Sequence, residues 1–579
     1  MSFDTEVLII GAGMSGLGLA VQLIRKFGVD SFEIIEKSND VGGTWLANTY
    51  PGCGCDVASH FYSYSFALNP DWSRKYSMRP EIQKYFRSIA EQYNIMPHIK
   101  FHSTVEKATW EEATATWIVT IKDQKTKQSR THKCKILVSA VGALSVPKEC
   151  QTPGASNFQG SLFHSAKWDH SFNWKNKDVV VLGNGCSATQ FVPIISGGPN
   201  AAKQVTQFSR QAHYLAERQN PYYSSAFKMV MRYVPFAMRL YRAKLYWEME
   251  RDFPGFVIEG GKVIREDLVK TNEEYVKQMA PKKYWDALIP KTEIGCKRKV
   301  LDTDYLSCLH RPNVELVPND PVEEITKDGV RTKSGRDVHA DAIVLAIGFE
   351  TQQMLFPMEI RGKKGISLND HWNSTSQGVA QAYFGTCVPG FPNFFIMMGP
   401  NTVTGHLSVI YTVECQINFT LRLIAPILRT LPLYRSRSIL PSLSLFSPSP
   451  SFVEVKPEAA HADSAWTQRE AKKLVWSSGC VNWAIDPKTG MNNMMYPDWQ
   501  FWFWWRSIFL KKQDFVYKDA KSGKKVKVGG STLGWISQTA ALGLLVGGGL
   551  VAAGFIDRNV VEEAAENMLE QARQLVGWK

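Results

Sequence analysis

Two glycine-rich turns have the residue types and spacing that bind dinucleotide phosphates. The first contains Gly11, Gly13 and Gly16 in G-x-G-x-x-G spacing, between an apolar run and a predicted helix. The first glycine permits a tight turn, the second lets backbone N–H groups approach a pyrophosphate, and the third lets helix and strand pack closely. The next predicted strand, 32–36, ends in Glu36, which can accept hydrogen bonds from both ribose hydroxyls and would repel a 2′-phosphate. This turn therefore predicts a site for FAD or NAD.

The second turn contains Gly183, Gly185 and Ala188 in G-x-G-x-x-A spacing. The strand predicted at 204–210 ends in Arg210, at the position that Glu36 occupies in the first unit. Because an arginine can donate two parallel hydrogen bonds to a 2′-phosphate, this unit is predicted to bind NADPH. The alternative is a second NAD-type site with an incidental arginine. Other residues of this turn expected to bind the cofactor are Ser187, Thr189 and Gln190.

The stretch between the two turns carries aromatic and ionisable residues at fixed offsets. They are Phe158, Gly160, His164, Trp168 and Asp169. Their place at the joint between two nucleotide-binding units makes them candidates for coupling those units. The alternative is a structural linker whose aromatic side chains pack.

Two further segments offer charged groups or irregular backbone. The segment 41–45 contains two glycines, and its residues Gly43, Thr44 and Trp45 are expected to lie close to a flat ring. An ordinary surface turn is the alternative. Asp56 follows a Gly- and Cys-rich turn and could orient a cationic partner. The consecutive Lys297, Arg298 and Lys299 are either a solvated run of charge or groups that meet a cofactor phosphate and a reactive oxygen species.

With these residues identified, positions 1 to about 425 resemble the Baeyer–Villiger monooxygenases, which are class B flavoprotein monooxygenases. The family fingerprint F-x-G-x-x-x-H-x-x-x-W-[P/D] is matched in full by Phe158, Gly160, His164, Trp168 and Asp169. The related N- and S-oxygenating flavin monooxygenases carry a similar motif but usually lack the Trp-Pro or Trp-Asp ending. The ending therefore favours Baeyer–Villiger chemistry.

The resemblance implies roles for single residues. Asp56 and Arg298 match the active-site aspartate and arginine of the family, and Lys297 and Arg210 match its NADP phosphate contacts. His164 matches a hinge position that need not touch the substrate. The segment 211–213 departs from the family, which often has threonine and proline there, so the finer phosphate contacts are in doubt.

The resemblance also implies a reaction. NADPH reduces FAD, O2 adds to give a C4a-peroxyflavin, and attack on a hydrophobic small-molecule ketone gives an ester or lactone. Arg298, held by Asp56, would stabilise the peroxide and polarise the carbonyl. One alternative is oxygenation at nitrogen, sulfur or an alkene by an enzyme of the same class. Another is a two-nucleotide flavoprotein reductase, but that needs a redox disulfide, and no cysteine pair has suitable spacing.

These motifs predict an α/β fold with two Rossmann-like domains, a helical insertion and a C-terminal apolar segment. A helix is expected at 79–95, a β-rich excursion at 101–140, and strands at 136–142 and 341–349 are both expected to return to the first nucleotide sheet. The predicted divisions are a first part of the FAD-binding domain at 1–146, an NADPH-binding domain at 147–310 with a helical insertion at 220–291, and a second FAD-binding part at 311–429.

Composition narrows the classes of partner. The 579 residues exceed one core, and the net charge of +13 suits nucleic acid, anionic lipid or a phosphorylated cofactor. Since no nucleic-acid or zinc-finger motif is visible, a phosphate-bearing cofactor and a membrane surface are favoured, and no metal site is predicted. The ten cysteines are unpatterned, which fits a reducing compartment, and no signal peptide precedes the first strand. Oligomeric state is left open.

The last third of the chain differs in character. Residues 430–451 are rich in Ser, Pro and Leu, and we expect a low-complexity loop or an artefact of an unspliced intron, with a helix resuming near Val453. Within the aromatic-rich segment 452–530, residues 476–483 and 496–506 resemble the closing segments of the family, in which a mobile loop covers the NADP site. The alternative is that they pack against the FAD domain.

An uncharged run follows several lysines near the C-terminus. Within 531–556, residues 533–556 are long enough to span a bilayer, and the preceding lysines would place the enzyme on the cytosolic side. Several glycines make the run only modestly apolar, so a peripheral hairpin or a packed helix is the alternative. A tail helix is expected at 557–579.

Overall fold

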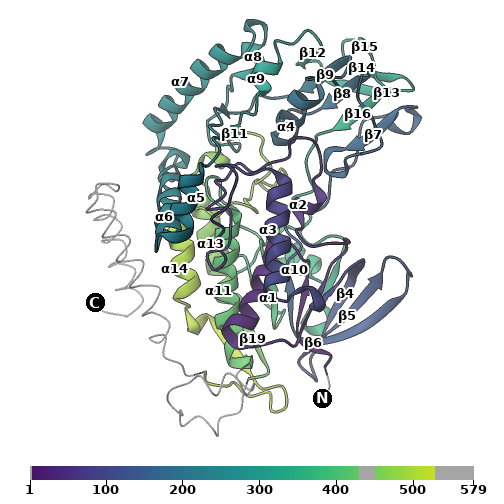
Figure 1. The fold of residues 1–579 in the computed structure, drawn as a ribbon. Helices are drawn as coiled ribbons and strands as arrows, with labels where there is room; N and C mark the ends of the chain where they lie inside the picture. Colours follow the sequence, from purple (N-terminus) through teal and green to yellow (C-terminus); the bar gives the residue numbers. More distant parts are fainter. Residues whose placement is uncertain (1–2, 429–449, 529–579) are drawn as a thin grey trace.

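The computed structural model describes residues 3–428 and 450–528. These residues form a mixed α/β fold with two large sheets, one at the bottom and one at the top in Figure 1, and a column of helices beside them. The predicted loop at 430–451, except its last two residues, lies outside the described residues. So do the candidate span at 531–556 and the tail helix at 557–579.

The lower sheet has eight strands in the order β17-β4-β5-β6-β1-β2-β3, with β18 paired to β6. Strands β1, β2, β3, β6 and β18 pair in parallel. The β-rich excursion predicted at 101–140 is present, and its strands β4, β5 and β6 form an antiparallel meander. The bounds are β1 (Thr5–Ile10), β2 (Phe32–Ile35), β3 (Ile99–Lys100), β4 (Ser103–Glu111), β5 (Thr116–Asp123), β6 (Ser129–Ser139), β17 (Glu359–Arg361) and β18 (Phe394–Ile396).

Strand β1 is buried on both faces, as its unbroken apolar sequence predicts. Val7 and Ile9 pack in the cluster that includes helices α1 (Met14–Phe27), α3 (Arg79–Gln92) and α11 (Val409–Leu428). The alternate residues Leu8 and Ile10 pack with Trp117 and Phe394 on the other face. This burial fixes the end of β1, where the first glycine turn begins.

The upper sheet has five parallel strands in the order β12-β9-β8-β16-β7. They are β7 (Ser161–His164), β8 (Asp178–Leu182), β9 (Gln204–Ser209), β12 (Val314–Pro318) and β16 (Ala342–Leu345), with α4 (Cys186–Ile195) and α9 (Tyr305–Cys308) beside them. The prediction that 341–349 returns to the first sheet was therefore wrong. Apolar runs of this kind fit any buried parallel strand, and the pairing partner is decided by tertiary contacts. Because β12 and β16 follow residue 310, the predicted domain boundary there does not coincide with the division between the sheets.

The helical insertion predicted at 220–291 is present. It consists of α5 (Ser225–Tyr233), α6 (Ala237–Glu250), α7 (Lys262–Met279) and α8 (Trp285–Leu288). Its base is closed by the short parallel pair β10 (Leu215–Ala216) and β11 (Val300–Leu301). A three-stranded antiparallel sheet, β13 (Val322–Thr326), β14 (Gly329–Thr332) and β15 (Asp337–His339), and the helix α10 (Leu368–Ser376) complete the middle of the chain.

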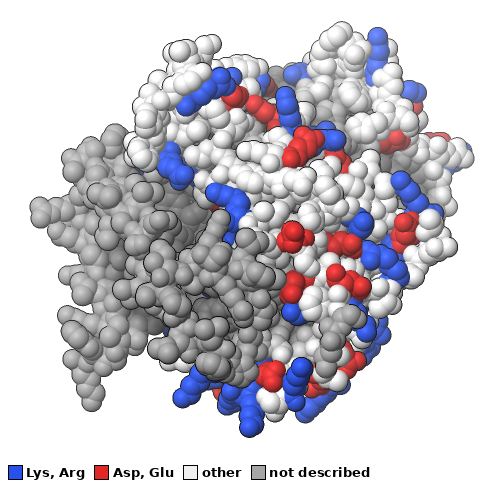
Figure 2. Space-filling view, turned by 60° about the horizontal axis from the view of Figure 1, so that its bottom comes forward, with Lys and Arg blue, Asp and Glu red and all other residues white. Residues whose placement is uncertain are grey.

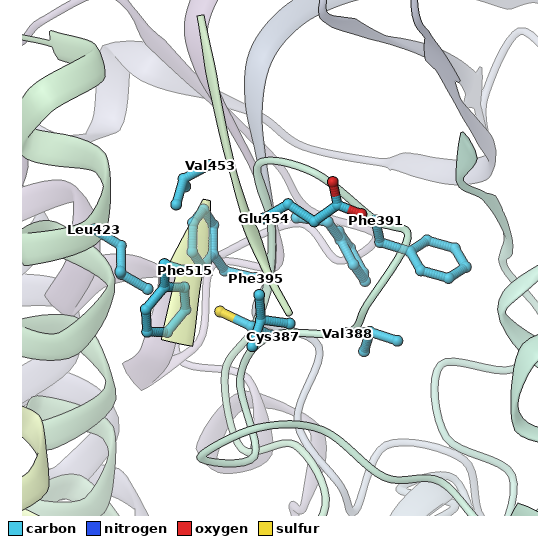
Figure 3. A pocket seen from close by; sticks show the side chains of 10 residues that line it. Cys387, Val388, Phe391, Phe395, Leu423, Val453, Glu454 and Phe515 are labelled. Carbon is cyan, nitrogen blue, oxygen red and sulfur yellow. The ribbon is translucent and has the colours of Figure 1, made fainter. Parts of the chain in front are cut away.

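The C-terminal segment begins with a strand where a helix was expected. Residues Phe452–Val455 form β19 and pair antiparallel with β20 (Phe515–Lys518), so the prediction of a helix near Val453 was wrong. The aromatic and β-branched residues Phe452, Val453 and Val455, all of them buried, favour the strand. The helix α13 starts only at Pro457 (Pro457–Ala471) and is followed by α14 (Gln500–Ile508). Residues of this hairpin line a small pocket together with Cys387, Phe395 and Leu423 (Figure 3). Its volume of about 10 Å³ leaves room for about one water molecule.

Two whole-molecule features bear on partners. Within the described ranges, no helix is both long and apolar enough to cross a membrane. On the face shown in Figure 2, basic and acidic side chains are interspersed, so the net positive charge is not gathered into one patch there.

Candidate active site

An ion pair joins the two segments that carry Asp56 and Arg298. Arg298 Nε donates to Asp56 Oδ2 at 2.7 Å and Nη2 donates to Oδ1 at 2.9 Å, so the guanidinium grips both carboxylate oxygens. The two residues are 242 positions apart in sequence. Both side chains are about one-third exposed, which leaves the pair open to a ligand.

The electrostatics of this pair keep both partners charged. Burial acts to raise the pKa of the Asp56 carboxyl, but the charge and hydrogen bonds of Arg298 outweigh it and hold the pKa below its usual value. The charge of Asp56 in turn raises the pKa of Arg298. Asp56 therefore orients a permanent positive charge.

The loop that carries Asp56 is held from the second unit. Gln190 on α4 accepts from Tyr50 Oη at 2.9 Å and donates from Nε2 to Gly54 O at 3.1 Å. Arg218 Nη2 donates to Cys55 O at 3.0 Å. Sequence reasoning grouped Gln190 with the cofactor residues and missed Arg218, which no motif marks. In the structure the Gln190 side chain contacts the Asp56 loop.

The first glycine turn has the geometry that its spacing predicts. Gly11 has φ +107°, a conformation that favours glycine, and a side chain at Gly16 would meet Gly11 O at 2.0 Å. Helix α1 has neither a side-chain cap nor an acidic residue in its first turn, so its N-terminal N–H groups face no competing anion from that turn. Glu36 is buried and accepts from Ala12 N and Ser38 N, both at 2.8 Å, which holds its carboxylate at the end of β2 beside the turn.

The segment at 42–45 lies against this turn. Gly43 has φ +54°, and a side chain there would come within 3.0 Å of Gly13 Cα. Thr44 starts the short helix α2 (Thr44–Ala47), and Trp45 is buried with its Nε1 donating to Tyr62 Oη at 3.0 Å. The structure thus brings together all the residues predicted for the first nucleotide site.

The second glycine turn repeats this arrangement. Gly183 has φ +113°, and a side chain there would meet Ala346 O at 2.4 Å. Gly185 precedes α4, which also lacks a side-chain cap and a first-turn acid. Ala188 is fully buried, as expected for the packing position. Ser187 is half-buried, and Thr189 is buried with its Oγ1 donating to Cys186 O.

Two cations lie together beside this second turn. Arg210 is exposed just after β9, and Lys297 Nζ donates to Gln211 Oε1. Burial, and next the charge of Arg210, lower the pKa of Lys297. Within the part of the chain that the structure describes, neither cation forms an ion pair with a carboxylate. Two such groups form a site that a phosphate would complete. By contrast, Lys299 pairs with Asp252 at 3.7 Å.

The fingerprint residues lie where the two units are connected. His164 ends β7; its Nδ1 accepts from Ala166 N at 3.0 Å, so Nε2 donates to Gly348 O at 3.0 Å. Burial lowers the pKa of His164, which favours this neutral form. The connecting segments pair with each other through Lys148 N to Gly348 O at 2.9 Å and Glu350 N to Val146 O at 2.8 Å. His164 thus contacts one of the paired segments that connect the two units.

The other fingerprint residues shape the same edge strand. A side chain at Gly160 would meet Asp341 O at 2.4 Å, and the Phe158 ring lies within 2.6 Å of the same point. Trp168 is buried between Phe163 and Phe191. Asp169 caps the following turn by accepting from Ser171 N at 2.9 Å. These contacts are structural, and Trp168 packs in the same core cluster as Cys55 and Val57, the two neighbours of Asp56 in the chain.

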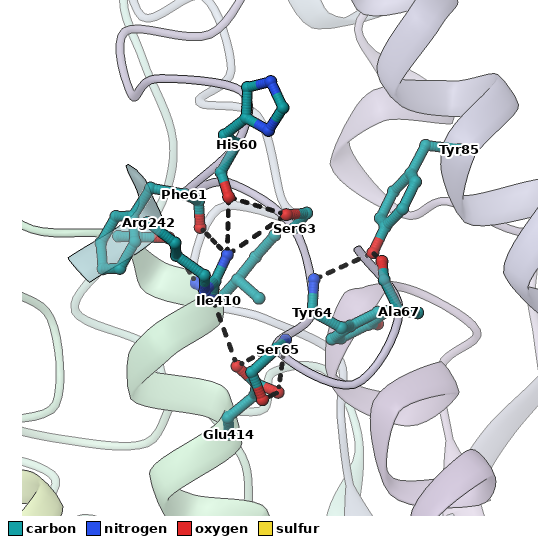
Figure 4. A network of polar contacts seen from close by, with 11 residues as sticks. His60, Phe61, Ser63, Tyr64, Ser65, Ala67, Tyr85, Arg242, Ile410 and Glu414 are labelled. Atoms are coloured by element: carbon teal, nitrogen blue, oxygen red, sulfur yellow. Dashed lines mark hydrogen bonds and ion pairs between the residues drawn. The ribbon is translucent and has the colours of Figure 1, made fainter. Parts of the chain in front are cut away.

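A buried polar network, missed at the sequence level, attaches the helical insertion to the segment after Asp56. Figure 4 shows Arg242 on α6 donating to His60 O at 2.9 Å, Phe61 O at 3.0 Å and Ser63 Oγ at 3.2 Å. Glu414 on α11 lies 3.6 Å from Arg242 and accepts from Ser65 N at 3.0 Å. A lone arginine in a helix gives no sequence signal for such a role.

A disulfide was also missed. The structure joins Cys296 and Cys480, with 6.5 Å between their Cα atoms. Cys296 precedes Lys297, and Cys480 belongs to the C-terminal aromatic segment, so that segment is tied to the Arg298 loop. The 184-residue separation is why no local spacing revealed the pair.

Three comparisons show what this chain is similar to. A family described as flavin-binding monooxygenase-like matches residues 4–256. A Baeyer–Villiger monooxygenase of Pseudomonas aeruginosa is 33% identical over 511 residues, which cover 88% of this chain and 90% of that protein. The FAD-binding monooxygenase ktnD of Aspergillus niger is 35% identical over 420 residues, 71% of this chain and 67% of that protein. The structure of an oxidised steroid monooxygenase bound to NADP has a TM-score of 0.73 at 25% identity and covers 89% of this chain and 99% of its own.

Proposed function

Because this chain belongs to the Baeyer–Villiger monooxygenase family of flavin-dependent monooxygenases, we propose that it inserts one oxygen atom of O2 into a hydrophobic ketone to give an ester or lactone. The proposed cofactors are FAD and NADPH. One observation carries the choice of reaction: Arg298 is held by both oxygens of Asp56, and both side chains are about one-third exposed.

The residues of each turn fit the cofactor proposed for it. The bare N-terminus of α1 and the carboxylate of Glu36 suit the pyrophosphate and ribose of FAD. The cations Arg210 and Lys297 suit the 2′-phosphate of NADPH, because no carboxylate among the described residues neutralises them. When bound, FAD and NADPH supply activated oxygen and hydride, respectively.

Arg298 is proposed to act on the substrate electrostatically. Its guanidinium stays charged, and Asp56 occupies Nε and Nη2, which leaves Nη1 to donate to a carbonyl oxygen or to an oxygen anion. Preorganised donors of this kind typically contribute about 3–4 kcal/mol of transition-state stabilisation. Asp56 acts through Arg298 and is not itself a proton carrier.

A labelling experiment tests the reaction class. The purified holoenzyme would be given NADPH and ¹⁸O2 with panels of hydrophobic ketones, sulfides, amines and alkenes. An ester or lactone carrying one ¹⁸O atom supports the proposal. Labelled sulfoxide, N-oxide or epoxide with unreacted ketone would assign the enzyme to heteroatom or alkene oxygenation instead, and NADPH oxidation without any labelled organic product would indicate a reductase.

A further inference from the structure

The turn between α5 and α6 exposes large apolar side chains. Met229 is 61%, Tyr233 is 70%, Phe236 is 68% and Leu240 is 52% exposed, and Val230, Val234 and Tyr222 are also exposed. Phe236 has φ +64°, a backbone conformation that residues other than glycine rarely adopt. Contiguous exposed apolar side chains of this kind mark surfaces that contact a partner or a membrane.

The hairpin that carries this turn is firmly held from its inner side. Phe227 and Tyr241 pack edge-on against the His60 ring, and Leu245 is buried. Arg242 binds the backbone of 60–61 and pairs with Glu414, as Figure 4 shows. The exposed apolar side chains therefore belong to an element whose inner side is packed against the rest of the protein, and they form its outer face.

The charged side chains in this part of the hairpin are all positive. Residues 218–247 contain no Asp or Glu. Lys228 and Arg239 form no ion pair with any residue of the described chain, while Arg232 pairs with Asp71, and Lys244 lies 3.5 Å from Glu248. An apolar surface on a segment that carries no acid of its own and has two cations without a carboxylate partner among the described residues complements the apolar and anionic layers of a lipid surface.

We propose that the α5–α6 hairpin binds the surface of anionic membranes. Met229, Tyr233 and Phe236 enter the boundary between headgroups and acyl chains, and Lys228 and Arg239 contact lipid phosphates. The hairpin lies on the membrane and does not cross it. Its inner side contacts residues 60–63, which follow Asp56 in the chain, so a substrate dissolved in lipid meets the enzyme at an element attached to that segment. The proposal does not depend on which atom the enzyme oxygenates.

Vesicle flotation of the full-length holoenzyme tests this proposal. We expect stronger binding to phosphatidylcholine–phosphatidylglycerol vesicles than to phosphatidylcholine alone, and release at high salt. The triple variant Met229→Asp/Tyr233→Asp/Phe236→Asp should bind at least about tenfold more weakly. The double variant Lys228→Gln/Arg239→Gln should lose the preference for anionic vesicles. Val263→Asp, at an exposed apolar position on α7 outside the hairpin, serves as the matched control and should bind like wild type.

Other occupants of this face give different results. If the triple variant floats as well as wild type, the membrane contact is elsewhere in the chain, for example at 533–556, and the proposal is overturned. It is also overturned if wild type does not float, or if wild type is a dimer that the triple substitution dissociates without vesicles. Unchanged flavin absorbance and melting temperature in every variant exclude misfolding as the cause.

Discussion

At the scale of single residues, the proposed reaction depends on the ion pair between Arg298 and Asp56. Two hydrogen bonds of 2.7 and 2.9 Å fix the plane of the guanidinium as well as its charge. A lysine could keep the charge but not the plane, so Arg298→Lys is not a conservative change. The neighbouring Lys297 points to a different task, because its partner is Gln211 beside Arg210.

We predict that Lys297→Ala raises the KM for NADPH about tenfold and leaves the KM for NADH within about twofold, since one charge-assisted hydrogen bond to phosphate contributes about 1.5 kcal/mol. Lys299→Ala is the matched control, because that lysine pairs with Asp252 and should not affect either KM. Steady-state kinetics with both cofactors make the comparison. An equal rise in both KM values would contradict the assignment of Lys297 to the 2′-phosphate.

Most of the proposed site residues could be predicted from sequence because they belong to motifs with local spacing. The glycine turns, Glu36 and Arg210 follow strands that their own sequences predict. Gln190, Arg218 and Arg242 act across more than a hundred positions of sequence, where spacing carries no signal. The Cys296–Cys480 disulfide escaped for the same reason.

At the scale of elements, α6 is the part of the insertion that bears on the site. Its Arg242 is buried, and the same burial lowers the pKa of Arg242 and raises that of Glu414, each opposed by the partner's charge. The pair fastens α6 and α11 to residues 60–65, four positions beyond Asp56. Losing either charge leaves the other buried without its ion-pair partner.

Arg242→Leu is predicted to lower the free energy of unfolding by about 3–5 kcal/mol, because Glu414 then loses its buried cation. The double variant Arg242→Leu/Glu414→Leu should recover part of that loss, and Arg239→Ala on the exposed side of the same helix should change stability by less than about 0.5 kcal/mol. Urea unfolding of the three variants measures the differences. If the double variant is no more stable than the single one, the loss of the Arg242–Glu414 ion pair is not the main cause of the lower free energy of unfolding.

The elements themselves were only partly predictable. Helical periodicity revealed the insertion at 220–291, and β-rich spacing revealed the meander at 101–140. The sequence of a buried strand does not predict which sheet the strand joins, and β16 was therefore assigned to the wrong sheet. β19 pairs with β20 across some sixty residues, and such non-local pairing decided against the helix expected near Val453.

At the scale of the molecule, the two sheets are joined by paired connecting segments that His164 contacts. Its hydrogen bond to Gly348 O, together with the Lys148 and Glu350 backbone bonds, sets how the two nucleotide turns face each other.

We predict that His164→Ala slows the reduction of bound flavin by NADPH about tenfold, the effect of losing about 1.4 kcal/mol at the transition state, and leaves the Kd for NADPH within twofold. Stopped-flow absorbance gives both values. A weaker Kd with an unchanged rate would place His164 in cofactor binding instead.

Acid should destabilise the folded chain through His60. Burial, and next the charge of Arg242, lower the pKa of His60 to about 4 in the folded state, against about 6.5 when unfolded. Between these values the unfolded state binds a proton that the native state does not, so stability falls as pH drops from about 6.5 toward 4. The shift predicts a loss of about 2 kcal/mol by pH ~5. In His60→Phe this part of the loss should disappear. If the free energy of unfolding depends on pH in the same way in the variant and in wild type, His60 is not the group responsible.

The most direct test of the central claim is the balance of products per NADPH consumed. With a ketone that the enzyme converts, wild type should form nearly one ester per NADPH. Arg298→Ala should still consume NADPH, while ester formation falls about 100- to 1000-fold and hydrogen peroxide accounts for the difference. Lys299→Ala should match wild type. If Arg298→Ala forms ester and peroxide in the wild-type ratio, the Asp56–Arg298 pair does not carry the oxygen-insertion step.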